Sequence, residues 1–201
     1  VVAIEPQQPF AGFLRWTLPY DIALIDAAVG RDEVEAEMAV SSRHPTVSSL
    51  QADFVSSAAD APGFGHVRWD ATQQVRMVTL DGLIARFGLP RYVKIDVEGY
   101  ELEVLAGLSH PVPILSVEFL PGFSHLTDAV IDRLAELGEY RFNPVQGERS
   151  GLLWPEWRDG AAVKAWVGTL PADAPSGDLF ARLPQDGPRA EPFPQAPHAT
   201  R

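Results

Sequence analysis

Lys94-Ile95-Asp96-Val97-Glu98-Gly99-Tyr100-Glu101 is the stretch of this 201-residue sequence that decides its fold class. A short apolar strand, expected over residues 91–96, runs into a cluster of acids, and Gly99 stands where that strand gives way to a helix over residues 99–108. In parallel sheets, ligands bind beyond the carboxyl ends of the strands. Asp96, at the end of the strand, is therefore a candidate site residue, whereas the dipole of the following helix accounts for some of the acids after it.

Apolar runs on both sides of this stretch predict further strands. Continuous apolar character is typical of strands buried on both faces, as in a parallel sheet, and it occurs at residues 1–4, 21–29 and 113–119. Residues 34–40 alternate apolar and charged side chains, which predicts a half-exposed strand. Weaker patterns allow short strands at residues 74–80, 140–142, 151–154 and 178–183.

Helical patterns separate several of these strands. They cover residues 9–19, 81–87, 99–108, 127–137 (with Thr127 as the expected N-cap) and 157–167. Alternation of strands and helices predicts an α/β fold with a mostly parallel sheet and right-handed crossovers. A long loop is expected over residues 41–73, where no periodicity is sustained.

Residues 1–183 are predicted to form one domain, and residues 184–201 a disordered, proline-rich tail. The sequence opens inside an apolar strand and without an initiating Met, which suggests a domain truncated at its N-terminus.

Composition limits the partners. The chain has 27 acidic and 16 basic residues, and a net charge of −11 repels phosphate backbones and anionic membranes. We therefore expect neither nucleic acid nor a membrane as partner. The chain has no cysteine, which excludes disulfides and thiol nucleophiles. No histidine pair has the spacing of a helical metal site, so no metal is expected. The absence of a signal peptide or membrane span favours the cytoplasm, and no pattern indicates an oligomeric state.

Four acids lie at or near the carboxyl ends of the expected strands: Glu5, Asp26, Asp96 and Glu118. Glu5 suits a carboxylate that accepts two hydrogen bonds from a ribose cis-diol, with a solvated acid before a proline as the alternative. Asp26 fits a surface turn better than a contact to adenine.

Asp96 and Glu118 are the candidates for chemistry. Asp96 follows an apolar strand directly, so we expect it to be partly buried, with either Lys94 or a ligand as its partner. Glu118 is either a single core acid satisfied by a backbone N–H or a second site residue. His66 and His125, both in expected loops, are weaker candidates for a base.

Several segments together resemble the FkbM family of S-adenosylmethionine-dependent methyltransferases. The resemblance covers residues 1–120 and extends more weakly to residue 183. The motifs that carry it, in order, are Val-Val-Ala-Ile-Glu-Pro (1–6), Ala28-Val29-Gly30, Val78-Thr79-Leu80-Asp81, the opening stretch, Leu105-Ala106-Gly107-Leu108 and Ser116-Val117-Glu118-Phe119. It implies the Rossmann-like class I methyltransferase fold: a seven-stranded, mostly parallel sheet with helices on both faces and one antiparallel strand near the end.

The resemblance also implies an activity, namely methyl transfer from S-adenosylmethionine to an oxygen of a sugar or secondary metabolite. The expected acceptor is thus a small molecule or a glycan. In this interpretation Glu5 holds the cofactor ribose, Asp96 and Glu98 face the reaction centre, and Asp26 and Ala28 complete the cofactor pocket. Asp96 is the first candidate for orienting or deprotonating the acceptor, and Glu118 the second.

One expected part of the family pattern is missing. The first strand and its glycine-rich loop should precede Val1, and the sequence does not contain them. Two main hypotheses follow: a methyltransferase whose N-terminal section lies outside this chain, or a degenerate domain that is non-catalytic or completed by a partner. A different nucleotide-binding enzyme is a third, although residues 94–101 favour methyl transfer over hydride transfer.

Overall fold

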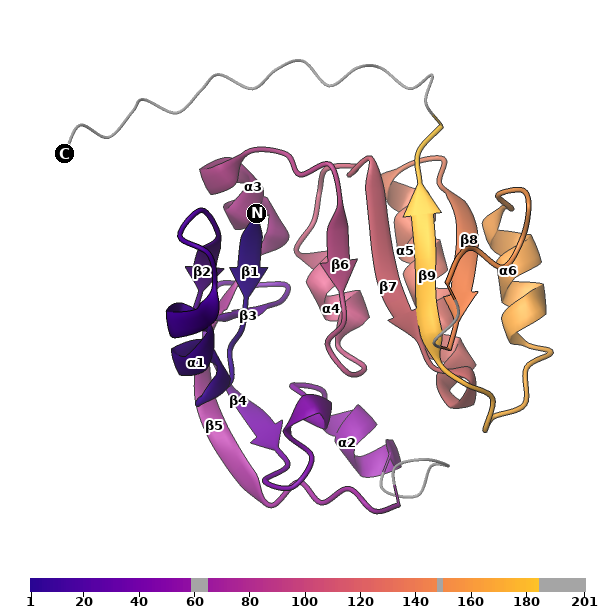
Figure 1. Ribbon diagram of the computed structural model, residues 1–201. Coiled ribbons are helices and arrows are strands. Elements are labelled where there is room, and N and C mark those ends of the chain that lie inside the picture. Colours follow the sequence, from indigo (N-terminus) through magenta and orange to yellow (C-terminus); the bar gives the residue numbers. More distant parts are fainter. Residues whose placement is uncertain (59–64, 148–149, 185–201) are drawn as a thin grey trace.

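A computed structural model describes residues 1–58, 65–147 and 150–184 of the chain (Figure 1). Its strands form three sheets. The first contains only β1 (Val2–Ile4) and β2 (Ala23–Ile25). The second has the order β3 (Ala28–Val29), β5 (Ala71–Val78), β4 (Glu35–Val40). The third has the order β6 (Val93–Ile95), β7 (Ile114–Phe119), β9 (Gly177–Arg182), β8 (Arg141–Gln146).

Strand direction is mixed, which corrects the expectation of a mostly parallel sheet. The pairs β1–β2, β3–β5 and β6–β7 are parallel, whereas β4–β5, β7–β9 and β8–β9 are antiparallel. β9 lies between β7 and β8 and runs against both, as the family resemblance implied for one late strand. The ribbon of β4 and β5 is an additional antiparallel pair, and the alternating pattern of β4 is typical of such half-exposed strands.

The helices are α1 (Phe10–Thr17), α2 (Ala52–Ala58), α3 (Leu80–Phe87), α4 (Glu101–Ala106), α5 (Ser124–Leu137) and α6 (Gly160–Val167). Short 3-10 turns, η1 (Pro45–Val47) and η2 (Pro121–Phe123), precede α2 and α5. α5 contacts both α4 and α6; in Figure 1, α4 and α5 lie behind the four-stranded sheet, and α6 lies beside β8. Helices were expected on both faces. Among the described residues, the rings of Tyr92 and Phe180 stack on the opposite face.

The main core lies between these helices and the four-stranded sheet. Leu105, Leu134 and Val163 from the helices are completely buried with Leu115 and Ala181 from the strands. Burying a side chain of this kind contributes about 1.5–3 kcal/mol. This packing fixes the carboxyl ends of β6 and β7, which carry the acids considered below.

Some local expectations were wrong. α5 begins at Ser124, directly after η2, so Thr127 is a buried residue inside the helix and not its N-cap. The apolar run at residues 21–29 is interrupted between β2 and β3. Residues 41–73 contain η1, α2 and the start of β5. Residues 151–154 form no strand.

Two further points concern the whole chain. The tail expected at residues 184–201 lies, except for Pro184, outside the described residues. Within the part of the chain that the structure describes, no helix is both long enough and apolar enough to cross a membrane.

Candidate functional site

A cavity of about 590 Å³ is lined by residues of both β1 and β6. Apolar side chains from both strands, including Ile4, Val93 and Ile95, form much of its wall. Among the described strands, β1 pairs only with β2 and β6 only with β7, so each has an edge without a neighbouring strand. Glu5, Asp96 and Glu98 also line this cavity, which therefore combines apolar walls with carboxylates.

Glu5 directly follows β1 and lies half-buried in the cavity wall. Its Oε1 accepts a hydrogen bond from the backbone N–H of Gln7 at 2.8 Å, and its own N–H donates to the carbonyl oxygen of Ile25 at 3.1 Å. Burial, together with nearby Asp26, raises the pKa of the Glu5 carboxyl although the Gln7 hydrogen bond opposes this. The carboxylate is therefore fixed at the end of the strand, where sequence analysis expected it.

Asp26 and Ala28 lie in different surroundings. Asp26 does not line the cavity: its Oδ2 accepts hydrogen bonds from Arg15 Nη2 at 2.9 Å and Gln8 Nε2 at 3.2 Å. This is the surface role that the sequence favoured for it. Ala28 is buried in β3 and does line the cavity.

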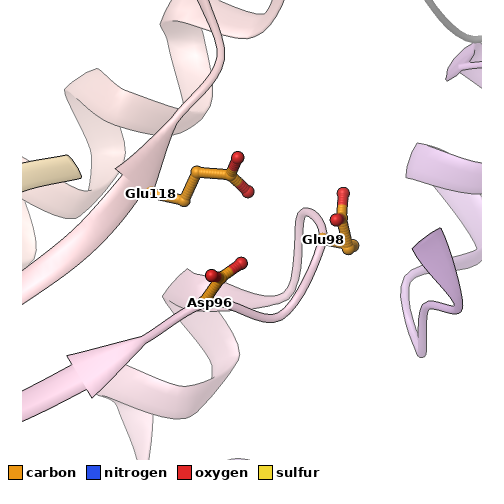
Figure 2. Close-up of side chains that lie close together, drawn as sticks. All are labelled: Asp96, Glu98 and Glu118. Carbon is orange, nitrogen blue, oxygen red and sulfur yellow. The ribbon is translucent and has the colours of Figure 1, made fainter. Parts of the chain in front are cut away.

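Asp96, Glu98 and Glu118 form a carboxylate cluster. One oxygen from each can be chosen so that all three lie within 4.8 Å of one another. Asp96 follows β6, Glu98 belongs to the turn before α4, and Glu118 lies near the end of β7. Figure 2 shows the three side chains pointing toward one space. The parallel pairing of β6 and β7 brings two of these acids to the same edge of the sheet.

Asp96 is more exposed than expected, since 47% of its side chain is accessible to solvent. Lys94 is its partner, as the alternation along the strand suggested, with Nζ lying 3.4 Å from Oδ2. The same ammonium donates to both carboxylate oxygens of Asp178, at 2.9 and 3.0 Å. Because β6 ends before Asp96, this side chain escapes the burial that the apolar strand suggested.

Glu118 and Glu98 carry the most perturbed carboxyl groups. Burial raises the pKa of Glu118 to about 8, and the nearby charges of Glu98 and Asp96 add to this effect. Burial likewise raises the pKa of Glu98 to about 7. Glu118 Oε2 is buried and has no hydrogen-bond partner among the described residues, so it is not a core acid satisfied on both oxygens. Both groups are thus able to exchange protons near neutral pH.

The turn that carries Glu98 has an unusual backbone. Glu98 has a φ of 52° and Gly99 a φ of 88°. Ser49 Oγ donates a hydrogen bond to the Glu98 carbonyl oxygen at 2.7 Å, and the Gly99 N–H donates to Glu101 Oε1 at 3.1 Å. A Cβ on Gly99 would lie 2.6 Å from the ring of Phe54, so this position requires glycine for space as well as for conformation.

A comparison with protein-family models gives the family of the chain. The model of the methyltransferase FkbM domain matches residues 1–142. The chain belongs to the FkbM methyltransferase family. The match includes Glu5 and all three members of the carboxylate cluster, and it ends within β8. No significant match was found among curated proteins or among solved structures.

Three residues that hold the site of this FkbM domain were missed by sequence reasoning: Ser49, Phe54 and Glu101. Ser49 and Phe54 fall in the region expected to be a long loop, and they contact a turn at residues 97–100 that is distant from them in sequence. Gly99 was the only available signal, because a glycine between strand and helix indicates a close approach of other atoms. Nothing in the sequence says which atoms these are.

His66 and His125, the weaker candidates for a base, lie apart from the carboxylate cluster of this FkbM domain. His66 packs its ring against His44, with centroids 4.7 Å apart, and His125 packs against Phe123. Neither His66 nor His125 lines the cavity. The oxygens of the cluster are close enough to hold a cation, but grouped exposed acids are common without one, and we assign no ion to them.

Proposed function

We propose that this FkbM domain binds S-adenosylmethionine in the cavity between β1 and β6 and transfers its methyl group to a hydroxyl oxygen of a small molecule or glycan. The observation that carries the proposal is that Glu5 and the acids Asp96 and Glu98 line one and the same cavity. Its volume of about 590 Å³ lies within the about 300–1,000 Å³ common for ligand pockets.

The residues present fit this cofactor. Glu5 suits the ribose because a fixed carboxylate at a strand end can accept hydrogen bonds from both hydroxyls of a cis-diol. Ala28 and Val29 offer a small apolar surface beside it. When bound, the cofactor supplies an electrophilic methyl group on a positively charged sulfur. Carboxylates near that charge, such as Asp96 and Glu98, favour its binding.

The carboxylate cluster handles the acceptor. Asp96, held by Lys94, accepts a hydrogen bond from the acceptor hydroxyl and so orients its oxygen. The ionised form of Glu118 takes up the hydroxyl proton, and because burial raises its pKa to about 8, this form becomes more populated as the pH rises toward and past that value. The acceptor class and a cytoplasmic location remain predictions.

The edges of β1 and β6 have no neighbouring strand among the described residues, and this favours a second candidate function, a non-catalytic domain completed by a partner. An uncovered strand edge is a common site for added strands. The two candidates differ in what they bind. Only the methyltransferase needs a cofactor in the cavity.

Calorimetric titration with S-adenosylhomocysteine tests the proposal. We expect binding by the chain as given and a loss of affinity of about tenfold or more in Glu5→Ala, because a hydrogen bond to a charged group is worth about 1.5–3 kcal/mol. Glu139→Ala is the matched control, since Glu139 is exposed and does not line the cavity. A folded chain that does not bind would reject the proposal for this chain and favour the second candidate.

A further inference from the structure

Glu101 is the most deeply buried acid near the site. It is the first residue of α4, and only 6% of its surface is exposed. Its Oε1 accepts the hydrogen bond from the Gly99 N–H at 3.1 Å. Burial raises the pKa of the Glu101 carboxyl, while backbone N–H groups of Glu101, Gly99 and Val97 act to lower it. The carboxylate thus turns back toward the backbone of the preceding turn.

The turn at residues 97–100, which precedes α4, needs hydrogen bonds of this kind to hold its backbone. Glu98 is the only non-glycine residue with a positive φ among the residues that the structure describes. A left-handed conformation is unfavourable for a side chain with a Cβ and persists only where the surroundings enforce it. Ser49 contacts this turn from one segment, and Glu101 contacts it from α4.

The left-handed conformation of Glu98 determines where its side chain points. With this backbone, the Glu98 carboxylate lies beside Asp96 and Glu118 (Figure 2). A turn that relaxed to an ordinary conformation would redirect the Glu98 side chain. The buried carboxylate of Glu101 is therefore placed to control where a neighbouring carboxylate points.

We propose that Glu101 is a positioning residue, which holds the 97–100 turn so that Glu98 faces the reaction centre. The term reaction centre rests on the proposed methyl-transfer function. The contacts by which Glu101 holds the turn do not depend on that function. If Glu101 served only to stabilise the start of α4, its replacement would lower stability and leave the surroundings of Glu98 unchanged.

Three substitutions of Glu101 separate its contacts from its charge. Glu101→Asp keeps the charge but is too short to reach Gly99. Glu101→Gln keeps an acceptor oxygen for Gly99 but removes the charge, which itself contributes to the pKa of Glu98. Glu101→Ala removes both. Glu103→Ala is the control, because Glu103 lies on the same helix and bonds Arg31 instead of the turn.

Two measurements by nuclear magnetic resonance need neither cofactor nor acceptor: the exchange rate of the Gly99 amide and the titration of the Glu98 carboxyl. In Glu101→Asp we expect faster exchange of Gly99, and a Glu98 pKa that falls from about 7 toward its ordinary 4.5 as the carboxylate moves into water. Glu101→Ala should change both at least as far. Glu101→Gln should keep the Gly99 amide protected, and Glu103→Ala should match the unmodified chain.

The proposal is overturned if Glu101→Asp leaves the Gly99 amide protected, or if it frees Gly99 while the Glu98 pKa stays near 7. Should Glu101→Ala fail to fold, the Asp and Gln variants still decide the question. An unmodified chain that binds no S-adenosylhomocysteine would reject the methyltransferase function, yet leave these two measurements unaffected.

Discussion

Glu118 and Glu98 should make the stability of the folded chain depend on pH. Their pKa values of about 8 and about 7 lie above the ordinary value of 4.5 that both carboxyls have in an unfolded chain. Between these values the unfolded chain releases protons that the folded chain retains. Stability therefore falls as pH rises from about 5 to 8, by up to about 1.4 kcal/mol per pH unit for each group.

Glu118→Gln should flatten this dependence, because the amide does not titrate. Urea unfolding at about pH 5, 6.5 and 8 measures the slope for the variant and for the unmodified chain. Glu139→Gln, at an exposed position, should keep the original slope. Equal slopes for Glu118→Gln and the unmodified chain would contradict the assignment of a raised pKa to Glu118.

At the residue scale, sequence analysis named most of the acids that the structure brings close together. Glu5, Asp96 and Glu118 were predicted because strand ends are recognisable from apolar runs, and Glu98 was predicted from the resemblance to the FkbM family. The structure brings these acids to one region. Their surroundings were less predictable. The exposure of Asp96 and the support of the Glu98 turn by Glu101 depend on where the chain bends, and an apolar pattern does not encode that.

At the scale of elements, Gly107 joins three segments. It follows α4, and its carbonyl oxygen accepts a hydrogen bond from the N–H of Asp81 in α3 at 3.0 Å. A Cβ at this position would overlap the carbonyl oxygen of Gly30, just beyond β3. Since a backbone carbonyl cannot move aside as a flexible side chain can, even one methyl group is too large here.

Gly107→Ala should therefore lower the free energy of unfolding by about 1–3 kcal/mol or more, the usual range for overpacking. The control is Gly12→Ala in α1, where a Cβ would lie 3.4 Å from the flexible side chain of Gln8. That variant should be neutral or more stable by up to about 1 kcal/mol, because alanine is the better helix residue. Chemical unfolding of both variants gives the comparison. A Gly107 variant as stable as the Gly12 variant would disprove the close contact.

The elements also show what periodicity can and cannot predict. The alternating pattern at residues 34–40 correctly predicted β4, and Gly88 correctly marked the end of α3. The N-cap assigned to Thr127 was wrong because η2 feeds directly into α5. The apolar pattern there is the same for a helix that starts three residues earlier.

For the whole molecule, the sequence predicted strands and helices better than their pairing. Apolar runs show that a strand is buried, but they do not show the direction of its neighbour. β9 could be placed between β7 and β8 only by the structure, and the antiparallel pairing of β4 with β5 was not expected. The sequence likewise did not show that β1 and β6 line one cavity, because the two strands lie far apart in sequence.

This arrangement predicts how the whole chain responds to a ligand. The cavity lies between β1 and β6, whose facing sides have no strand partner among the described residues. Hydrogen exchange followed by mass spectrometry should therefore show protection in both strands at once when S-adenosylhomocysteine binds, because one ligand contacts both walls. β8 and β9 form the far side of the four-stranded sheet and should be unchanged. Protection on one side only would place the ligand outside the cavity, and the carboxylates of Glu5 and Asp96 would then not act on the same molecule.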